Sequence, residues 1–234
     1  MKDVFIGNGA GFSGDRFDAS IPVIKQLATC MGPRYLTFEV LAERTIASAQ
    51  RLKQQDPDKG YSPYLHHYIA PCLKLALENK IKIISNMGAA NPASGAKAIH
   101  EIAQEMGLPK PRIAVVCGDD LLAYMDQSEL LKQPTMEGTS LDAQSELLSA
   151  NVYLGARCVA DALKHDPDIV LVGRTTDSAL ILGPLIHEFG WSEEQYDQLA
   201  AGTICGHLLE CGGQVTGAYF ADPGFKDVDH LERV

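Results

Sequence analysis

The chain lacks the short motifs of several common catalytic sites. Its 234 residues contain no G-x-S-x-G turn, no G-K-[ST] loop and no H-E-x-x-H motif. There is no C-x-x-C pair either, and the six cysteines are scattered along the sequence. These absences disfavour an α/β-hydrolase, a P-loop nucleotide triphosphatase and the usual zinc sites. The cysteines are expected to be reduced and mostly buried.

Positive charge and long apolar runs are also scarce. Twenty Lys and Arg oppose 30 Asp and Glu, a formal net charge of −10, whereas sequence-independent nucleic-acid binding needs a basic face. No run of about 20 apolar residues could span a bilayer, and the N-terminus lacks the apolar stretch of a secretion signal. We therefore expect a cytoplasmic protein that binds neither nucleic acid nor membranes.

Apolar runs and helical patterns alternate along the chain. Five short, nearly all-apolar segments have the composition of buried parallel strands, and helical patterns separate them. The expected strands are residues 4–6, 34–39, 81–85, 112–117 and 168–172. A long helix is expected over 143–164. The pattern predicts a doubly wound α/β fold, Rossmann-like, with a mostly parallel sheet and helices on both faces.

Polar side chains and glycines follow every expected strand. Because right-handed crossovers bring the carboxyl ends of parallel strands to one edge, these tips form one candidate site. Glu39, Asp119 and Asp120 are the candidate general acids or bases, since neighbouring carboxylates push each other's pKa apart. The candidates for binding substrate or phosphate are Asn8, Gly9, Gly11, Ser13, Gly14, Asn86, Gly88, Asn91, Arg174, Thr175 and Asp177.

Some of these side chains have purely structural alternatives. Asn91, Asp119 and Asp177 stand where helix caps are needed. Arg174 could form an ion pair with Asp177 instead of binding a carboxylate or phosphate.

A second cluster, Cys205, His207, Glu210 and Cys211, could hold a metal or pair a nucleophile with its base. The surrounding sequence has the pattern of a helix end and turn, which favours a structural role. No metal site is predicted, and the sequence requires no cofactor.

The loop after the first strand holds four glycines in eight positions. Gly9, Gly11 and Gly14 match the G-x-G-x-x-G spacing of a dinucleotide loop, and Glu39 ends the next strand, where a ribose-binding acid would lie. This pattern leaves an NAD(P)-dependent oxidoreductase open. A tight strand-to-helix turn is the structural alternative.

Several longer segments resemble the N-terminal domain of the acyclic terpene utilization (AtuA-like) family. They are GNGAGFSGDR (7–16), NMGAANP (86–92), GR followed by Asp177 (173–177), LGPLIHEFGW (182–191) and GHLLEC (206–211). The resemblance covers nearly the whole chain. Because family members usually continue further, it implies that residues 1–234 are an N-terminal α/β domain, truncated at its C-terminal end.

The resemblance implies a role in bacterial and fungal catabolism of acyclic terpenes such as citronellol and geraniol, which are degraded as CoA thioesters. The expected function is an enzyme acting on a terpenoid acyl-CoA or carboxylate by hydration or lyase chemistry, with the CoA thioester as part of the substrate. A non-catalytic subunit that binds an acyl-CoA or a partner is the alternative. The chain is expected to associate with further copies of itself, with a C-terminal domain or with a partner subunit, and the sequence does not choose among the three.

Overall fold

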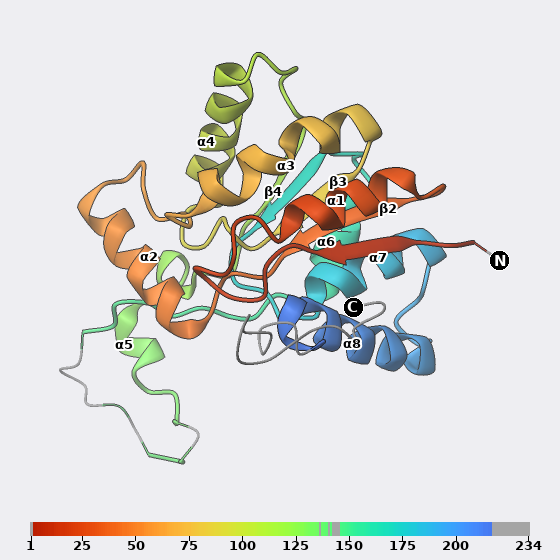
Figure 1. Ribbon diagram of the computed structural model, residues 1–234. Coiled ribbons are helices and arrows are strands. Elements are labelled where there is room, and N and C mark those ends of the chain that lie inside the picture. The colour runs from red at the N-terminus through yellow and green to blue at the C-terminus, as the bar shows by residue number, and fades with distance from the viewer. Residues whose placement is uncertain (1, 136, 140, 142–145, 217–234) are drawn as a thin grey trace, which may run out of the picture.

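The computed structural model describes residues 2–135, 137–139, 141 and 146–216 (Figure 1). A single five-stranded sheet has the order β1-β2-β3-β5-β4, with every pairing parallel. The strands are β1 (Phe5–Asn8), β2 (Arg34–Phe38), β3 (Lys82–Ser85), β4 (Ile113–Val116) and β5 (Ile169–Val172). Each overlaps a predicted strand, and the doubly wound α/β fold is confirmed.

Helices cover both faces of the sheet, as Figure 1 shows. One face carries α1 (Ser20–Thr29), α3 (Leu65–Asn79) and α4 (Pro92–Glu105), and the other carries α6 (Ala156–Leu163), α7 (Ala179–Phe189) and α8 (Tyr196–Glu210). The helices α2 (Glu43–Gln55) and α5 (Gln127–Leu130) lie beyond the carboxyl ends of the strands. Within the described ranges, no helix combines the length and apolar character needed to cross a bilayer.

The strands are apolar on both sides because each side packs against helices. Leu36 and Phe38 of β2 join the core beneath α1, α3 and α4, whereas Tyr35 joins the core beneath α6 and α7. Ile83 and Ile84 of β3 divide in the same way, as the alternation of side chains along a strand requires. Each fully buried large apolar side chain contributes roughly 1.5–3 kcal/mol, so the two cores fix the sheet between its helix layers.

The strand order places a change of crossover direction between β3 and β5. The chain leaves β3 for α4 on one face and leaves β5 for α7 on the other. Doubly wound sheets usually bind ligands beyond the carboxyl ends of the strands at such a divergence. Gly88 lies at this point, and a Cβ there would come within 2.5 Å of the Val172 carbonyl oxygen. The close approach of the two strand tips therefore requires glycine at this position.

The long helix predicted over 143–164 is wrong in the described part of that range, where only α6 is helical. The preceding segment binds the strand tips instead. The Val152 amide donates to the Asp119 carbonyl at 2.8 Å, and the Leu154 amide donates to the Arg174 carbonyl at 3.2 Å. These tertiary hydrogen bonds satisfy the backbone without a helix, so they override the local helical periodicity.

Candidate functional site

Three neighbouring strand tips converge on a buried pair, Glu39 and Arg174. Glu39 directly follows β2, and Arg174 follows β5. Their side chains are 9% and 3% exposed, and Arg174 Nη1 lies 3.8 Å from Glu39 Oε1. Glu39 Oε1 also accepts hydrogen bonds from Asn86 Nδ2 at 2.6 Å and from the Leu41 amide at 3.2 Å. The fold thus brings together three of the predicted site residues, from β2, β3 and β5.

The environment of Glu39 favours its protonated form. Burial raises the pKa of Glu39 to about 7, and the negative charge of Asp177 adds to the rise. The hydrogen bond from Asn86 opposes it. A carboxyl group with a pKa near 7 can donate or accept a proton at physiological pH. Glu39 therefore has the properties of a general acid or base.

Arg174 is held by acidic, aromatic and backbone groups. Its Nη2 donates to Asp177 Oδ1 at 2.9 Å, its Nη1 donates to the Leu41 carbonyl, and its guanidinium carbon lies 4.1 Å from the centre of the Tyr153 ring. Asp177 therefore forms the predicted ion pair rather than the predicted helix cap. Arg174 Nε and Thr175 Oγ1 are buried with no hydrogen-bond partner among the described residues. Unpaired buried donors are rare in proteins, and a ligand could satisfy them.

Tyr153 is a site residue that the sequence analysis missed. Its ring covers Arg174, and its hydroxyl donates to Glu43, whose Oε1 lies 3.7 Å from Arg174 Nη2. Tyr153 falls in the range that was predicted to be helical, so the sequence carried no signal that this side chain would reach a strand tip.

Asp119 and Asp120 are engaged by structural partners. Asp119 Oδ2 accepts from the Arg174 amide and from Asn151 Nδ2, both at 2.9 Å, and burial raises the pKa of Asp119. The Asp120 side chain caps the 3-10 turn that follows β4, so the cap lies one residue later than the one predicted at Asp119. Asp120 Oδ2 also lies 3.6 Å from Lys53 Nζ. The two carboxylates thus hold the β4 and β5 tips and α2 together. A catalytic role for either stays a prediction, and the geometry favours Glu39.

Asn8 and Asn91 mainly bind backbone groups. Asn8 Nδ2 donates to the Glu210 carbonyl at 2.6 Å, which ties the β1 tip to the end of α8. Asn91 Nδ2 donates to the Pro57 carbonyl at 2.8 Å, and its Oδ1 accepts from the Ser94 amide at 3.4 Å. The predicted cap at Asn91 is therefore confirmed. These bonds occupy the amide groups that were expected to bind substrate.

The glycine loop after β1 makes hydrogen bonds within the protein. The Gly9 amide donates to the Thr37 carbonyl at 2.8 Å, and the Gly11 amide donates to Asp15 Oδ2 at 2.9 Å. Helix α1 begins only at Ser20, and β1 is an edge strand. A dinucleotide loop instead directs its glycine amides at phosphate from a helix N-terminus beside the crevice. These differences disfavour the oxidoreductase alternative.

The same loop packs closely against the end of α8. Ser13 and Gly14 complete the loop, and Gly14 has a φ of 85°, in the left-handed region that favours glycine. A Cβ at Gly11 would lie 2.4 Å from the Cys211 carbonyl oxygen. This close contact explains the glycine at position 11 without any role in binding a ligand.

Gly11→Ala is expected to destabilise the protein by about 1–3 kcal/mol, because the backbone must shift to admit the methyl group. Thermal unfolding of the purified variant measures the effect. Gly155→Ala is the matched control, since a Cβ at Gly155 meets no atom within 4 Å and its φ is −82°. Equal melting temperatures for both variants would contradict the close contact.

The cysteine and histidine cluster is partly assembled. Glu210 Oε1 lies 3.4 Å from His207 Nδ1 and accepts a hydrogen bond from Cys211 Sγ at 3.4 Å, while Cys205 is exposed. Burial and the neighbouring carboxylates raise the pKa of Cys211, which keeps its thiol protonated and opposes a nucleophilic role. Among the residues that the structure describes, no three His, Cys, Asp or Glu side chains are placed to share a metal ion.

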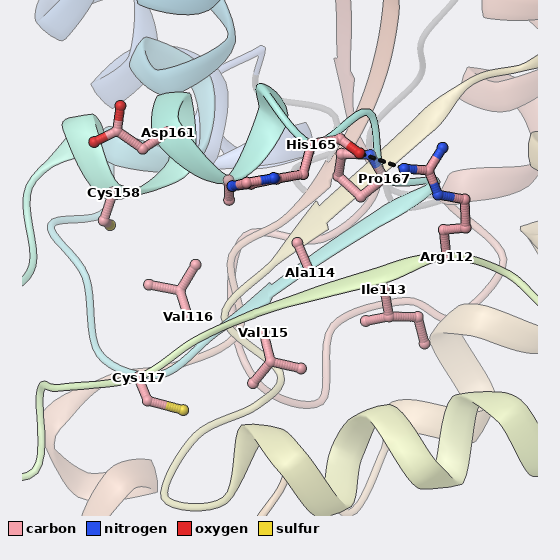
Figure 2. A pocket seen from close by; sticks show the side chains of 11 residues that line it. Arg112, Ile113, Ala114, Val115, Val116, Cys117, Cys158, Asp161, His165 and Pro167 are labelled. Atoms are coloured by element: carbon pink, nitrogen blue, oxygen red, sulfur yellow. Dashed lines mark hydrogen bonds between the residues drawn. The ribbon is translucent and has the colours of Figure 1, made fainter.

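A groove of about 550 Å³ lies along the edge strand β4, away from the Glu39 and Arg174 pair. Figure 2 shows Ala114 and Val116 pointing toward α6, where Cys158 lies, with Arg112 at the far end. None of the predicted site residues lines this groove. It is therefore separate from the candidate site.

A comparison with protein families decides the broader relationship. Residues 4–234 match the family model described as acyclic terpene utilisation family protein AtuA. The chain belongs to the acyclic terpene utilisation family. The AtuA match takes in all five strands together with Glu39, Asn86 and Arg174, so the candidate site lies within the family region. No curated protein and no solved structure matches the chain.

Proposed function

We propose that this protein is a catabolic enzyme that binds a terpenoid acyl-CoA or carboxylate at the carboxyl edge of its sheet and moves a proton with Glu39. Membership of the AtuA family supports the terpene context. The observation that carries the chemistry is a buried carboxyl group with a pKa of about 7, held 3.8 Å from a buried guanidinium. The reaction class that this favours is hydration or a related lyase step.

Glu39 suits this chemistry because adding water to an unsaturated acyl thioester requires one proton to leave the water and one to reach carbon. A carboxyl group near its pKa serves either transfer. Asn86 and the Leu41 amide orient Glu39 through the same oxygen, Oε1. The unpaired Arg174 Nε and the Thr175 hydroxyl are donors for a carbonyl or carboxylate oxygen of the substrate. The proposal requires no cofactor.

A non-catalytic acyl-CoA-binding subunit is the second candidate. It is favoured by the structural engagement of Asp119 and Asp120 and by the ion pair that already occupies Arg174. In that case Glu39 would only hold the strand tips together, and substrate binding would occur without turnover.

The test is a thermal-shift titration with a branched, unsaturated ten-carbon acyl-CoA, followed by an assay for loss of its conjugated enoyl absorbance. The wild type is expected to be stabilised by the ligand and to turn it over. Glu39→Gln is expected to keep the thermal shift and lose about 100-fold or more in rate. Glu101→Gln, at an exposed position of α4, is the matched control and should change neither.

The outcomes separate the two candidates. A thermal shift without turnover in the wild type would favour the binding subunit. The absence of any shift with acyl-CoA and with the free terpenoid acid would contradict both.

A further inference from the structure

Helix α8 turns an apolar stripe toward solvent. The stripe consists of Ala200, Ala201, Ile204 and Leu208, all exposed, whose helical spacing places them on one side of the helix. Ile204 and Leu208 are 64% and 53% exposed. A helix on the surface of a globular protein normally directs such a stripe into the core. An exposed apolar stripe of this kind marks an interaction surface.

The opposite side of α8 explains this inverted arrangement. Gly202 faces Leu182 and Trp191, and Gly206 faces Ser178, where a Cβ would come within 2.9 Å of the Ser178 carbonyl oxygen. The glycines let α8 pack closely on α7 while its larger apolar side chains face outward. Figure 1 shows α8 at the periphery of the molecule.

We propose that the α8 stripe is a homodimerisation surface, on which two copies of the helix pack antiparallel across a two-fold axis that passes the stripe at the level of Gly202. This register places Ala200 against the partner's Ile204. It also places Asp197 against the partner's His207.

Self-complementarity is what selects a second copy as the occupant. A two-fold interface joins one patch to itself, so each half of the patch must fit the other half. The small side chains of the stripe, Ala200 and Ala201, precede the large ones, Ile204 and Leu208, along the helix. Antiparallel packing therefore places Ile204 of each copy over the partner's Ala200, and Leu208 beside the partner's Tyr196, which is 73% exposed.

The charges at the two ends of the stripe also fit this register. Asp197 lies in the first turn of α8, and His207 lies in the last turn with its side chain 72% exposed. His207 Nδ1 lies 3.4 Å from Glu210 Oε1, which leaves Nε2 for the partner's carboxylate, and a protonated imidazole donates from both nitrogens. Between these two residues the helix contains no Asp, Glu, Lys or Arg, so the like charge of two acidic molecules is kept away from the contact. Antiparallel helix dipoles add a favourable term.

Ile204→Glu is expected to convert a wild-type dimer into a monomer in sedimentation-equilibrium or light-scattering measurements. The melting temperature of the variant should stay close to that of the wild type diluted to a monomer, because Ile204 is mostly exposed. Met31→Glu is the matched control, since Met31 is 89% exposed but lies outside α8, and it should remain dimeric. A wild type that is monomeric at its highest soluble concentration, or an Ile204→Glu variant that still dimerises, would overturn the proposal.

A charge exchange tests the register of the two helices. Asp197→His and His207→Asp should each weaken the dimer by about tenfold or more, because each sets like groups against one another. The double variant restores the pair in reverse and should recover most of the lost affinity. Failure of the double variant to recover, with both single variants folded, would overturn the antiparallel register.

Discussion

Arg174→Met is expected to destabilise the protein by about 3 kcal/mol, because it removes the buried guanidinium that donates to the Leu41 carbonyl and pairs with Asp177. The Arg174 side chain is only 3% exposed, and it faces Glu39 at 3.8 Å and Asp177 at 2.9 Å. Asp177 is 41% exposed and can be hydrated after the change, whereas Glu39 is 9% exposed and, with its raised pKa, takes up a proton instead of carrying an uncompensated charge. Most of the loss should therefore come from the Leu41 carbonyl, which loses its side-chain donor, and from the contact between the guanidinium and the Tyr153 ring.

Urea unfolding measures this loss. The matched control is Arg44→Met, which removes an exposed arginine from α2, close to the same site, and should change the unfolding free energy by less than about 0.5 kcal/mol. Arg174→Lys should recover only part of the stability, since an ammonium group lacks the planar fork that reaches Leu41 and Asp177 together. Equal unfolding curves for Arg174→Met and Arg44→Met would show that the strand tips do not depend on the buried guanidinium.

Glu39→Gln is expected to remove a loss of stability that the wild type undergoes as the pH rises. The unfolding free energy of the variant, relative to that of the wild type, should therefore be larger at high pH than at low pH. The pKa of Glu39 in the folded protein is about 7, compared with an ordinary value of 4.5. Between these two values the folded state retains a proton that the unfolded state has released. The wild type therefore loses stability as the pH rises from about 4.5 to about 7, and the loss approaches about 3 kcal/mol. Glutamine carries no charge and does not contribute this loss.

Unfolding free energies at pH 5 and pH 8 test this expectation. The difference between Glu39→Gln and the wild type should grow by about 2–3 kcal/mol between the two pH values. Glu101→Gln, on the exposed face of α4, should show the same pH dependence as the wild type. If the Glu39→Gln curve runs parallel to the wild-type curve, Glu39 is already ionised in the folded protein, and its proposed role as a proton carrier fails.

The strands and their polar tips could be predicted because their signals are local. A strand buried on both faces is apolar at successive positions, as Ile83 and Ile84 are. The helix expected over 143–164 could not be judged locally, because the strand tips supply hydrogen bonds to Val152 and Leu154 that compete with helix formation. The capping role of Asn91 could also be predicted, because it depends on the amide of Ser94, only three residues later in the sequence.

The sequence by itself determined the parallel sheet, the glycine and polar tips, and the family of this protein. Only the tertiary structure decided which tips meet, since apolar patterns do not specify strand order. The order β1-β2-β3-β5-β4 inserts β5 beside β3 and brings Arg174 to Glu39 and Asn86. The raised pKa of Glu39 also depends on the packing, because desolvation arises only when the neighbouring tips and loops close around the carboxyl group.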